Sequence, residues 1–118
     1  MKQVLIDGIP LVSDLRVANN VFARTRGLML ASPLQPGQGL EIRPCNSIHM
    51  MFMRFPIDAV FFNKAGQVVK VASSVPAWRG LSFGGRKAAG VLELPAGAAA
   101  NVSVGDQLTW KDSSQGDE

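Results

Sequence analysis

The stretch from Asp58 to Val75 reads DAVFFNKAGQVVKVASSV and contains the clearest hairpin pattern in the chain. Its first part, residues 58–63, and its last part, residues 67–75, are rich in the β-branched and aromatic residues that favour strands. The residues between them, Asn63 to Gly66, have the composition of a tight turn. This pattern predicts two antiparallel strands joined by a short turn.

Outward from this hairpin, short apolar runs alternate with turns rich in glycine and proline. The Asp7-Gly8 pair predicts a hairpin turn, because glycine accepts the positive φ that such a turn needs. One short helix is expected over residues 20–29, with Asn20 as its N-cap. Segment 76–90 contains four glycines and is expected to be irregular. Further strands are expected within residues 3–12 and at residues 14–18, 40–43, 47–53, 91–94 and 107–111.

Seven or eight short strands with one short helix predict an all-β fold. A doubly wound α/β fold is disfavoured because strands and helices do not alternate along the chain. With 118 residues, the chain has the length of one domain. We therefore expect a single-domain β-sandwich or β-barrel over residues 1–111, followed by a disordered acidic tail at residues 112–118. The core is expected to include Phe52, Val60, Phe62, Val69, Leu92 and Leu108.

The composition excludes several classes of protein. Apolar residues make up 47% of the chain and charged residues 18%, which excludes an intrinsically disordered body. The single cysteine, Cys45, excludes a disulfide scaffold and any zinc site that needs two or more cysteines. Asp7, Gly8 and Pro10 interrupt the apolar run that a secretory signal would need, and no window reaches the roughly 20 apolar residues of a membrane span. We therefore expect a cytoplasmic protein.

The net charge of +3 is unevenly distributed. Between Ile42 and Leu92 the only acid is Asp58, whereas there are seven bases. Such a basic middle region favours anionic partners, although the same charge also serves solubility. The seven bases are Arg43, Arg54, Lys64, Lys70, Arg79, Arg86 and Lys87.

A series of short motifs follows one another in a recognisable order. The series begins with Arg26-Gly27-Leu28-Met29, continues through residues 47–53 and 56–62, and ends with residues 91–97 and Gly105-Asp106. In this order the chain, over roughly residues 9–110, resembles a bacterial and archaeal family called domain of unknown function 192. The resemblance implies a compact, mostly β domain, and it implies no activity, cofactor or catalytic residue. Many members of that family carry Phe-Trp-Met where this chain has Met51-Phe52-Met53.

Two carboxylates, Asp58 and Glu93, each lie inside an apolar strand pattern. If the fold brought them together, the pKa of one would rise and the pair could act as general acid and base. Alternatively, each carboxylate braces its surroundings by accepting hydrogen bonds from backbone amides or by pairing with an arginine such as Arg54 or Arg79. We expect Asp58 to have this bracing role.

Other side chains could in principle bind a metal or act as a nucleophile. His49, Met51 and Met53 would share one face of an extended strand, and imidazole and thioether groups can bind copper. Methionine is more often a core residue, so we expect no metal site. Cys45 and His49 would lie about 13 Å apart in an extended chain, too far for a catalytic pair. No phosphate-binding glycine loop is present, so no nucleotide cofactor is expected.

Segment 76–90 has the composition of a recognition loop. Two aromatic residues, Trp78 and Phe83, alternate with three cations, Arg79, Arg86 and Lys87, and the segment contains no acid. These residue types dominate binding hot spots, and the glycines would let a ligand approach the backbone. An alternative is that Trp78 and Phe83 plug the end of the sandwich.

The sequence thus favours a non-enzymatic binding or accessory module whose ligand-facing surface is residues 76–90. Its partner would be a small anionic ligand or another protein, and no membrane is expected. One alternative is a small acid–base enzyme that uses Asp58 and Glu93. A second alternative is weak nucleic-acid binding through the basic middle region, although the chain lacks the motifs of known single-strand binders.

Overall fold

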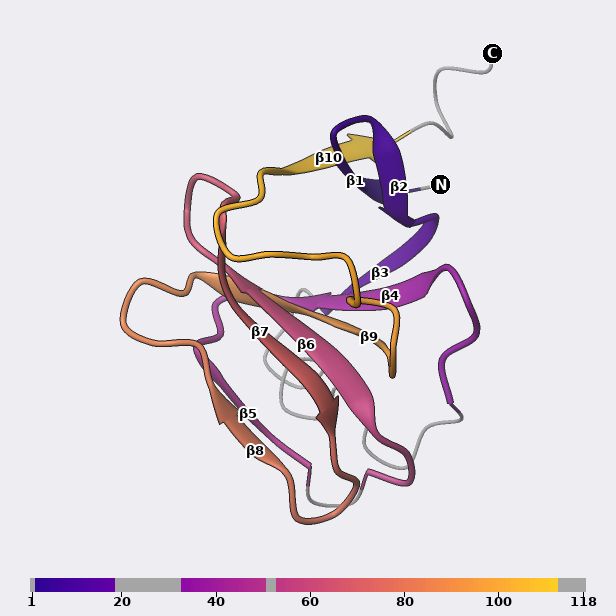
Figure 1. Ribbon diagram of the computed structural model, residues 1–118, viewed down its shortest axis with the longest axis vertical. Coiled ribbons are helices and arrows are strands. Elements are labelled where there is room, and N and C mark those ends of the chain that lie inside the picture. The colour runs from indigo at the N-terminus through magenta and orange to yellow at the C-terminus, as the bar shows by residue number, and fades with distance from the viewer. Residues whose placement is uncertain (1, 19–32, 51–52, 113–118) are drawn as a thin grey trace.

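The computed structural model describes residues 2–18, 33–50 and 53–112. These residues form strands in three sheets and contain no helix, and therefore no helix that could cross a membrane (Figure 1). The strands are β1 (Lys2–Ile6), β2 (Ile9–Val12), β3 (Asp14–Ala18), β4 (Gln38–Ile42), β5 (Ser47–His49), β6 (Ile57–Phe62), β7 (Val68–Val75), β8 (Leu81–Phe83), β9 (Gly90–Pro95) and β10 (Leu108–Asp112).

A five-stranded sheet in the order β3-β4-β9-β6-β7 forms the middle layer of the molecule. Its neighbouring strands are antiparallel except β3 and β4, which are parallel. Every residue of β6 is buried, because both faces of this sheet are covered. The pairing of β6 with β7 confirms the predicted hairpin of residues 58–75, which forms one edge of the main sheet and the strand next to it.

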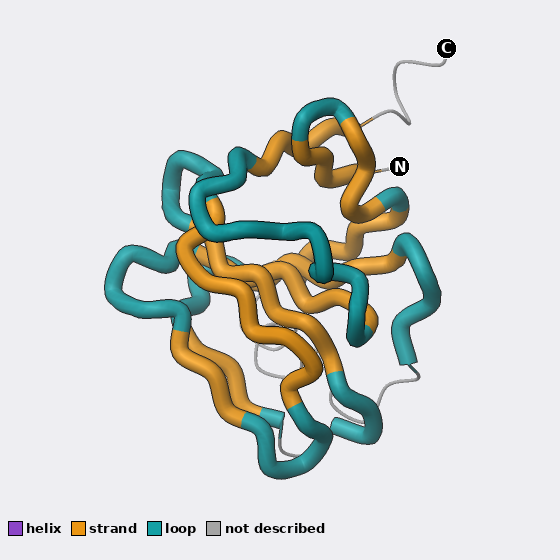
Figure 2. The backbone as a smooth tube through the Cα atoms, in the orientation of Figure 1, coloured by secondary structure: helices purple, strands orange, loops and turns teal. Residues whose placement is uncertain are grey.

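Smaller sheets cover the two faces of the middle sheet (Figure 2). The three-stranded sheet β10-β1-β2 packs on one face, where Val4 and Leu108 meet Val60 and Phe62. The two-stranded ribbon β5-β8 lies on the other side, where Ile48 belongs to the second cluster. Alternation along β6 and β9 supplies both cores, because successive side chains of a strand point to opposite faces.

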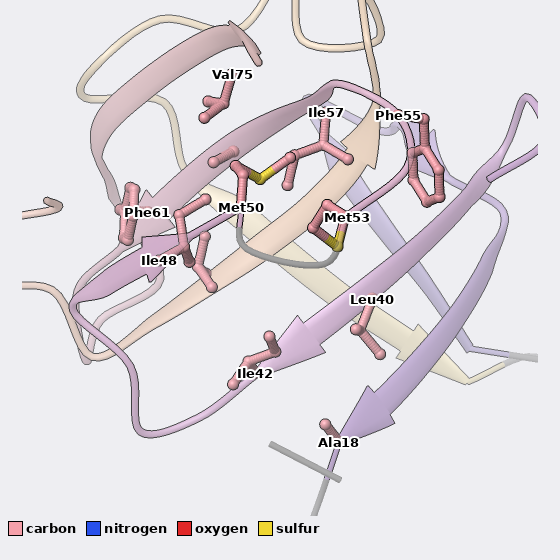
Figure 3. Packing of buried hydrophobic residues seen from close by; sticks show 12 residues of the cluster. Ala18, Leu40, Ile42, Ile48, Met50, Met53, Phe55, Ile57, Phe61 and Val75 are labelled. Atoms are coloured by element: carbon pink, nitrogen blue, oxygen red, sulfur yellow. The ribbon is translucent and has the colours of Figure 1, made fainter. Parts of the chain in front are cut away.

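The core beneath the β5-β8 ribbon combines aliphatic, aromatic and thioether side chains (Figure 3). Met50 and Met53 are 1% and 2% exposed and lie against the sheet residues Ile57 and Phe61 in the same cluster. A backbone hydrogen bond, 3.0 Å long, runs from the Met53 N–H to the Met50 carbonyl oxygen. These two methionines are therefore core residues.

Several predictions about the fold are confirmed. The fold is all-β, and the Asp7-Gly8 turn between β1 and β2 has the positive φ values of 54° and 78° that its composition predicts. The strand predicted at residues 14–18 is β3. Val60, Phe62, Leu92 and Leu108 are buried, as expected of core residues.

Other predictions need correction. The described strands do not close into a barrel, because β3 and β7 remain the edges of the middle sheet. Val69 is only partly buried. Asp112, which was placed in the tail, pairs with Lys2 at the end of β10. The helix expected at residues 20–29, the core residue Phe52 and the rest of the tail lie outside the described residues.

Candidate binding surface

Asp58 lies on β6 and has a structural environment. The residue is 1% exposed, and its Oδ1 accepts a hydrogen bond from the Ser74 N–H at 2.8 Å. Its Oδ2 accepts two more, from the N–H groups of Gly97 at 3.0 Å and Ala99 at 2.8 Å. One carboxylate therefore holds the end of β7 and the turn after β9 against β6, which is the bracing geometry that the sequence suggested.

Glu93 lies on the neighbouring strand, but it does not meet Asp58. In the pairing of β6 with β9, Asp58 is opposite Leu94, whereas Glu93 is opposite Ala59. Since side chains alternate along a strand, Asp58 points toward the β10-β1-β2 layer and Glu93 toward the ribbon layer. The two carboxylates do not form the acid–base pair considered from the sequence, because the middle sheet separates them.

Glu93 is a buried acid with an unsatisfied oxygen. It is 6% exposed, and its Oε1 has no hydrogen-bond partner among the described residues. Burial raises the pKa of Glu93 to about 7, because a charged carboxylate is costly in apolar surroundings. Burial also raises the pKa of the Cys45 thiol, and the Glu93 carboxylate acts in the same direction. Cys45 is consequently a weakly nucleophilic thiol, and its Sγ lies 3.1 Å from the Ser47 carbonyl oxygen.

The residues considered as metal ligands do not gather at one place. His49 is exposed on the ribbon, whereas Met53 is buried in the core, and Met51 lies outside the described residues. Within residues 2–18, 33–50 and 53–112, no three His, Cys, Asp or Glu side chains come close enough to hold a metal ion.

Segment 76–90 contains a strand that the sequence did not predict. Residues 81–83 form β8 and pair with β5, with Leu81 opposite His49 and Phe83 opposite Ser47. Ser82 faces inward and is buried, whereas Leu81 and Phe83 face outward and are 60% and 58% exposed. Three-residue strands carry little periodicity, and the pairing partner lies more than thirty residues away, so no local signal marks this ribbon.

The proposed plug at the end of the sandwich is not what the structure contains. Trp78, in the turn before β8, is 54% exposed, and Phe83 is exposed to a similar extent. Side chains that sealed a core would be largely removed from solvent. The aromatic residues of segment 76–90 are therefore presented on the surface.

Two glycines of this segment serve packing. A Cβ on Gly84 would lie 2.3 Å from the Phe61 ring, and one on Gly80 would lie 2.4 Å from the Pro76 carbonyl oxygen. These glycines let the ribbon approach the middle sheet, whereas the sequence suggested that they allow a ligand to approach. Gly85 differs from them, because its φ of 92° makes it a turn residue with open space beside it.

The loop after β8 forms a pocket with the turn between β6 and β7. This pocket, of about 440 Å³, is lined by the basic residues Lys64, Arg86 and Lys87 and by Asn63, Ala65, Ala88 and Ala89. We call it the basic pocket. Arg86 and Lys87 were predicted as site residues, whereas Lys64 was placed in a turn and counted only among the bases of the basic middle region. Lys64 lines the pocket because the two turns meet in space, and no local sequence motif predicts such a meeting.

The predicted site residues thus fall at the two ends of β8. Arg86 and Lys87 follow the strand and line the basic pocket, whereas Trp78 and Arg79 precede it. Figure 1 shows these turns at opposite ends of the ribbon. Phe83 lies between them on the exposed face of β8. The structure therefore arranges the five predicted residues along the ribbon rather than around one point.

Comparison with known proteins identifies the family of this chain. The model of domain of unknown function 192, described as an uncharacterized ACR family, matches residues 3–110. The chain belongs to this family. A UPF0127 protein of Pyrococcus furiosus is 37% identical over 102 residues, which cover 82% of this chain and 86% of that protein. Another UPF0127 protein, from Pyrococcus horikoshii, is 30% identical over 105 residues. The aligned region covers 82% of this chain and 87% of that protein.

Two solved structures resemble this member of the domain of unknown function 192 family. A protein of unknown function from Novosphingobium aromaticivorans superposes with a TM-score of 0.81 at 21% identity, covering 92% of this chain and 83% of that chain. A protein from Sinorhizobium meliloti, described as a candidate transcription regulator, superposes with a TM-score of 0.76 at 20% identity. This superposition covers 92% of this chain and 91% of that chain. At these identities the likeness establishes the fold. Function has to be argued from the surface itself.

Proposed function

We propose that the protein is a binding module for anionic ligands and that the basic pocket is its anion site. The observation that carries this proposal is the convergence of Lys64, Arg86 and Lys87 on one pocket whose lining includes no carboxylate. Cations grouped without an acid attract anions, and a concave wall lets several of them act on one ligand.

The walls of the basic pocket are held by backbone hydrogen bonds. On one side, the Asn63 Oδ1 accepts hydrogen bonds from the N–H groups of Ala65 and Gln67, which fix the turn that carries Lys64. On the other side, the Ala89 N–H donates to the Phe62 carbonyl oxygen at 2.7 Å and ties the loop after β8 to the middle sheet. The backbone of the pocket is therefore ordered before a ligand binds, so the conformational entropy cost of binding falls on the cationic side chains alone.

The placement of the carboxylates supports binding over acid–base catalysis. Both oxygens of Asp58 are engaged by backbone N–H groups, and Glu93 lies on the opposite face of the sheet. Neither residue lines the basic pocket. An anion in the pocket would therefore meet cations and backbone, with no paired acid and base beside it.

The proposal is tested by chemical-shift mapping and calorimetry with inorganic phosphate and citrate at low salt. We expect binding to shift signals of residues 63–65 and 86–89 and to weaken as salt is added, because the cations are exposed. The double variant Arg86→Ala/Lys87→Ala should weaken binding about fivefold or more.

The matched control is Lys2→Ala/Lys111→Ala, which removes the same charge from exposed positions on β1 and β10. This control should bind phosphate and citrate as the unmodified protein does. Equal losses in the two double variants would reduce the effect to net charge and contradict a site at the basic pocket.

A further inference from the structure

The exposed face of the ribbon and the basic pocket follow one another along the chain, because the loop that lines the pocket leaves the end of β8. This series of side chains begins with Trp78 and Arg79, follows the outward side chains Leu81 and Phe83 with His49 beside them, and ends at Arg86 and Lys87. We call it the ribbon strip. It contains three of the large apolar side chains that are more than half exposed in the described residues, namely Trp78, Leu81 and Phe83.

Charge along the ribbon strip is of one sign. From residue 59 to residue 92 the sequence contains five bases and no acid. The bases Arg79 and Arg86 lie on either side of β8 and are both exposed. Residues 80–84, which are β8 with one residue at each end, span about 13 Å at the rise of an extended chain, and Arg79 and Arg86 lie beyond the two ends of this span. Cations separated by such a distance suit a ligand with several successive negative charges better than one small anion.

The centre of the strip presents two exposed apolar side chains. Leu81 and Phe83 stand side by side on one face of β8, with His49 and Ser47 directly across the ribbon. Aromatic rings on such a face offer a stacking surface for nucleobases, while cations at its ends attract phosphates. A polymer that alternates phosphates with planar bases matches both features.

We propose that the ribbon strip binds single-stranded nucleic acid, with phosphates held at Arg79 and in the basic pocket and with bases stacked on Phe83 and Trp78. This inference rests on the proposed function, because the basic pocket holds part of the ligand. Stacking on an aromatic ring does not distinguish strongly between bases, so the expected binding has little sequence preference.

The experiment compares two labelled oligonucleotides of about ten nucleotides, one of oligo-dT and one abasic with the same phosphates, by fluorescence anisotropy. We expect oligo-dT to bind about tenfold more tightly than the abasic strand, since stacking of a base on an aromatic ring supplies the difference. Raising the salt from about 50 mM to about 200 mM should weaken the binding of both.

Variants separate the two contributions. Phe83→Ser should reduce the preference for oligo-dT to within about threefold, and Trp78→Gly, which suits the φ of 68° at that position, should reduce it as well. Arg86→Ala should weaken both strands to a similar extent. The matched control is Ile9→Ser, at a position 71% exposed on β2, which should change neither affinity.

The outcomes distinguish this inference from the proposed function. Equal binding of oligo-dT and the abasic strand would overturn the stacking proposal and leave the anion site standing. Absence of binding to both strands and to phosphate would overturn both. Binding to phosphatidylserine vesicles without binding to oligo-dT would identify the strip as a lipid-facing surface and also overturn the inference.

Discussion

Asp58 and Glu93 are both buried strand carboxylates, yet their partners differ. Asp58 accepts three backbone hydrogen bonds, so its charge is stabilised by N–H dipoles. Glu93 has an oxygen without a partner among the described residues, so its charged form is penalised. A buried carboxylate on a neighbouring strand is therefore braced by backbone N–H groups in one place and has a raised pKa in the other.

Replacement of Asp58 by asparagine should destabilise the protein. The amide group presents a donor where a carboxylate oxygen now accepts, so at least one buried backbone N–H loses its partner. We expect a loss of about 2–4 kcal/mol in the free energy of unfolding, measured by urea denaturation. Asp106→Asn is the control, because Asp106 accepts one exposed bond from the Ser103 N–H, and its loss should be smaller. An unchanged midpoint for Asp58→Asn would contradict the bracing role.

Glu93 should make stability depend on pH. The pKa of Glu93 is about 7 in the folded protein and 4.5 in its ordinary range, so the folded state binds more protons between these values. The contribution of Glu93 to the free energy of unfolding is therefore greatest below about pH 4.5. This contribution falls by about 3 kcal/mol as the pH rises to about 7. Cys45 titrates above this window, because burial raises the pKa of its thiol.

The variant Glu93→Gln should remove this decline, because a neutral amide does not titrate. Urea denaturation at a series of pH values from 5 to 8 measures the free energy of unfolding of both proteins. The slope of this free energy against pH gives the change in the number of bound protons on unfolding. Asp106→Asn should retain the decline of the unmodified protein. The assignment to Glu93 fails when the slope of stability against pH survives in Glu93→Gln.

At the scale of elements, the ribbon β5-β8 depends on a close approach to the middle sheet. Gly84 lies directly over Phe61, where a Cβ would be 2.3 Å from the ring. The Gly84 N–H also donates to the Asn46 carbonyl oxygen at 2.7 Å, at the end of the ribbon. The position of the ribbon, and with it the outward face of Phe83, is therefore set by a residue without a side chain.

Gly84→Ala should displace the ribbon or strain the core beneath it. We expect a loss of about 1–3 kcal/mol in the free energy of unfolding, typical of an overpacked site. A double-mutant cycle with Phe61→Ala tests the cause, since removing the ring with its Cγ should reduce the cost of the added methyl group. If Gly84→Ala lowered the free energy of unfolding equally with and without the Phe61 substitution, the Phe61 ring would not be the reason for a glycine at position 84.

The sequence predicted elements best where they are long or carry a distinctive turn. The hairpin of residues 58–75 and the Asp7-Gly8 turn were both identifiable, because their strands and turns follow one another locally. The parallel pairing of β3 with β4 and the β5-β8 ribbon were not, since each joins segments distant in sequence. For the same reason the burial of Asp58 could be expected, but its separation from Glu93 required the register of β6 and β9.

Across the whole molecule, the three layers share buried side chains and should unfold together. Leu108 and Trp110 of β10 belong to the same cluster as Phe62 of the middle sheet. The Phe62 and Trp110 rings are 5.1 Å apart in an edge-on arrangement, and the Trp110 indole N–H donates to a Glu41 carboxylate oxygen. Trp110 therefore reports on the junction between the outer sheet and the middle sheet.

In a Trp78→Phe background, where Trp110 is the single tryptophan, unfolding followed by fluorescence and by far-UV circular dichroism should coincide. Coincidence is expected because β10 and the middle sheet form one core. A fluorescence transition at lower denaturant concentration would mean that the β10-β1-β2 layer melts separately.

The pairing of β1 with β10 has a consequence for how the chain folds. Lys2 lies opposite Asp112, so the first strand is completed by the last one. During synthesis, the edge of β1 that pairs with β10 therefore stays unpaired, and the apolar side of β1 and β2 stays uncovered. Both conditions last until more than a hundred residues after β1 have been added. Closing so long a loop is slow, and waiting strands invite pairing with other chains. This domain should therefore need chaperones more than a helical protein of equal size does. Joining β1 and β10 by a short linker should accelerate its folding.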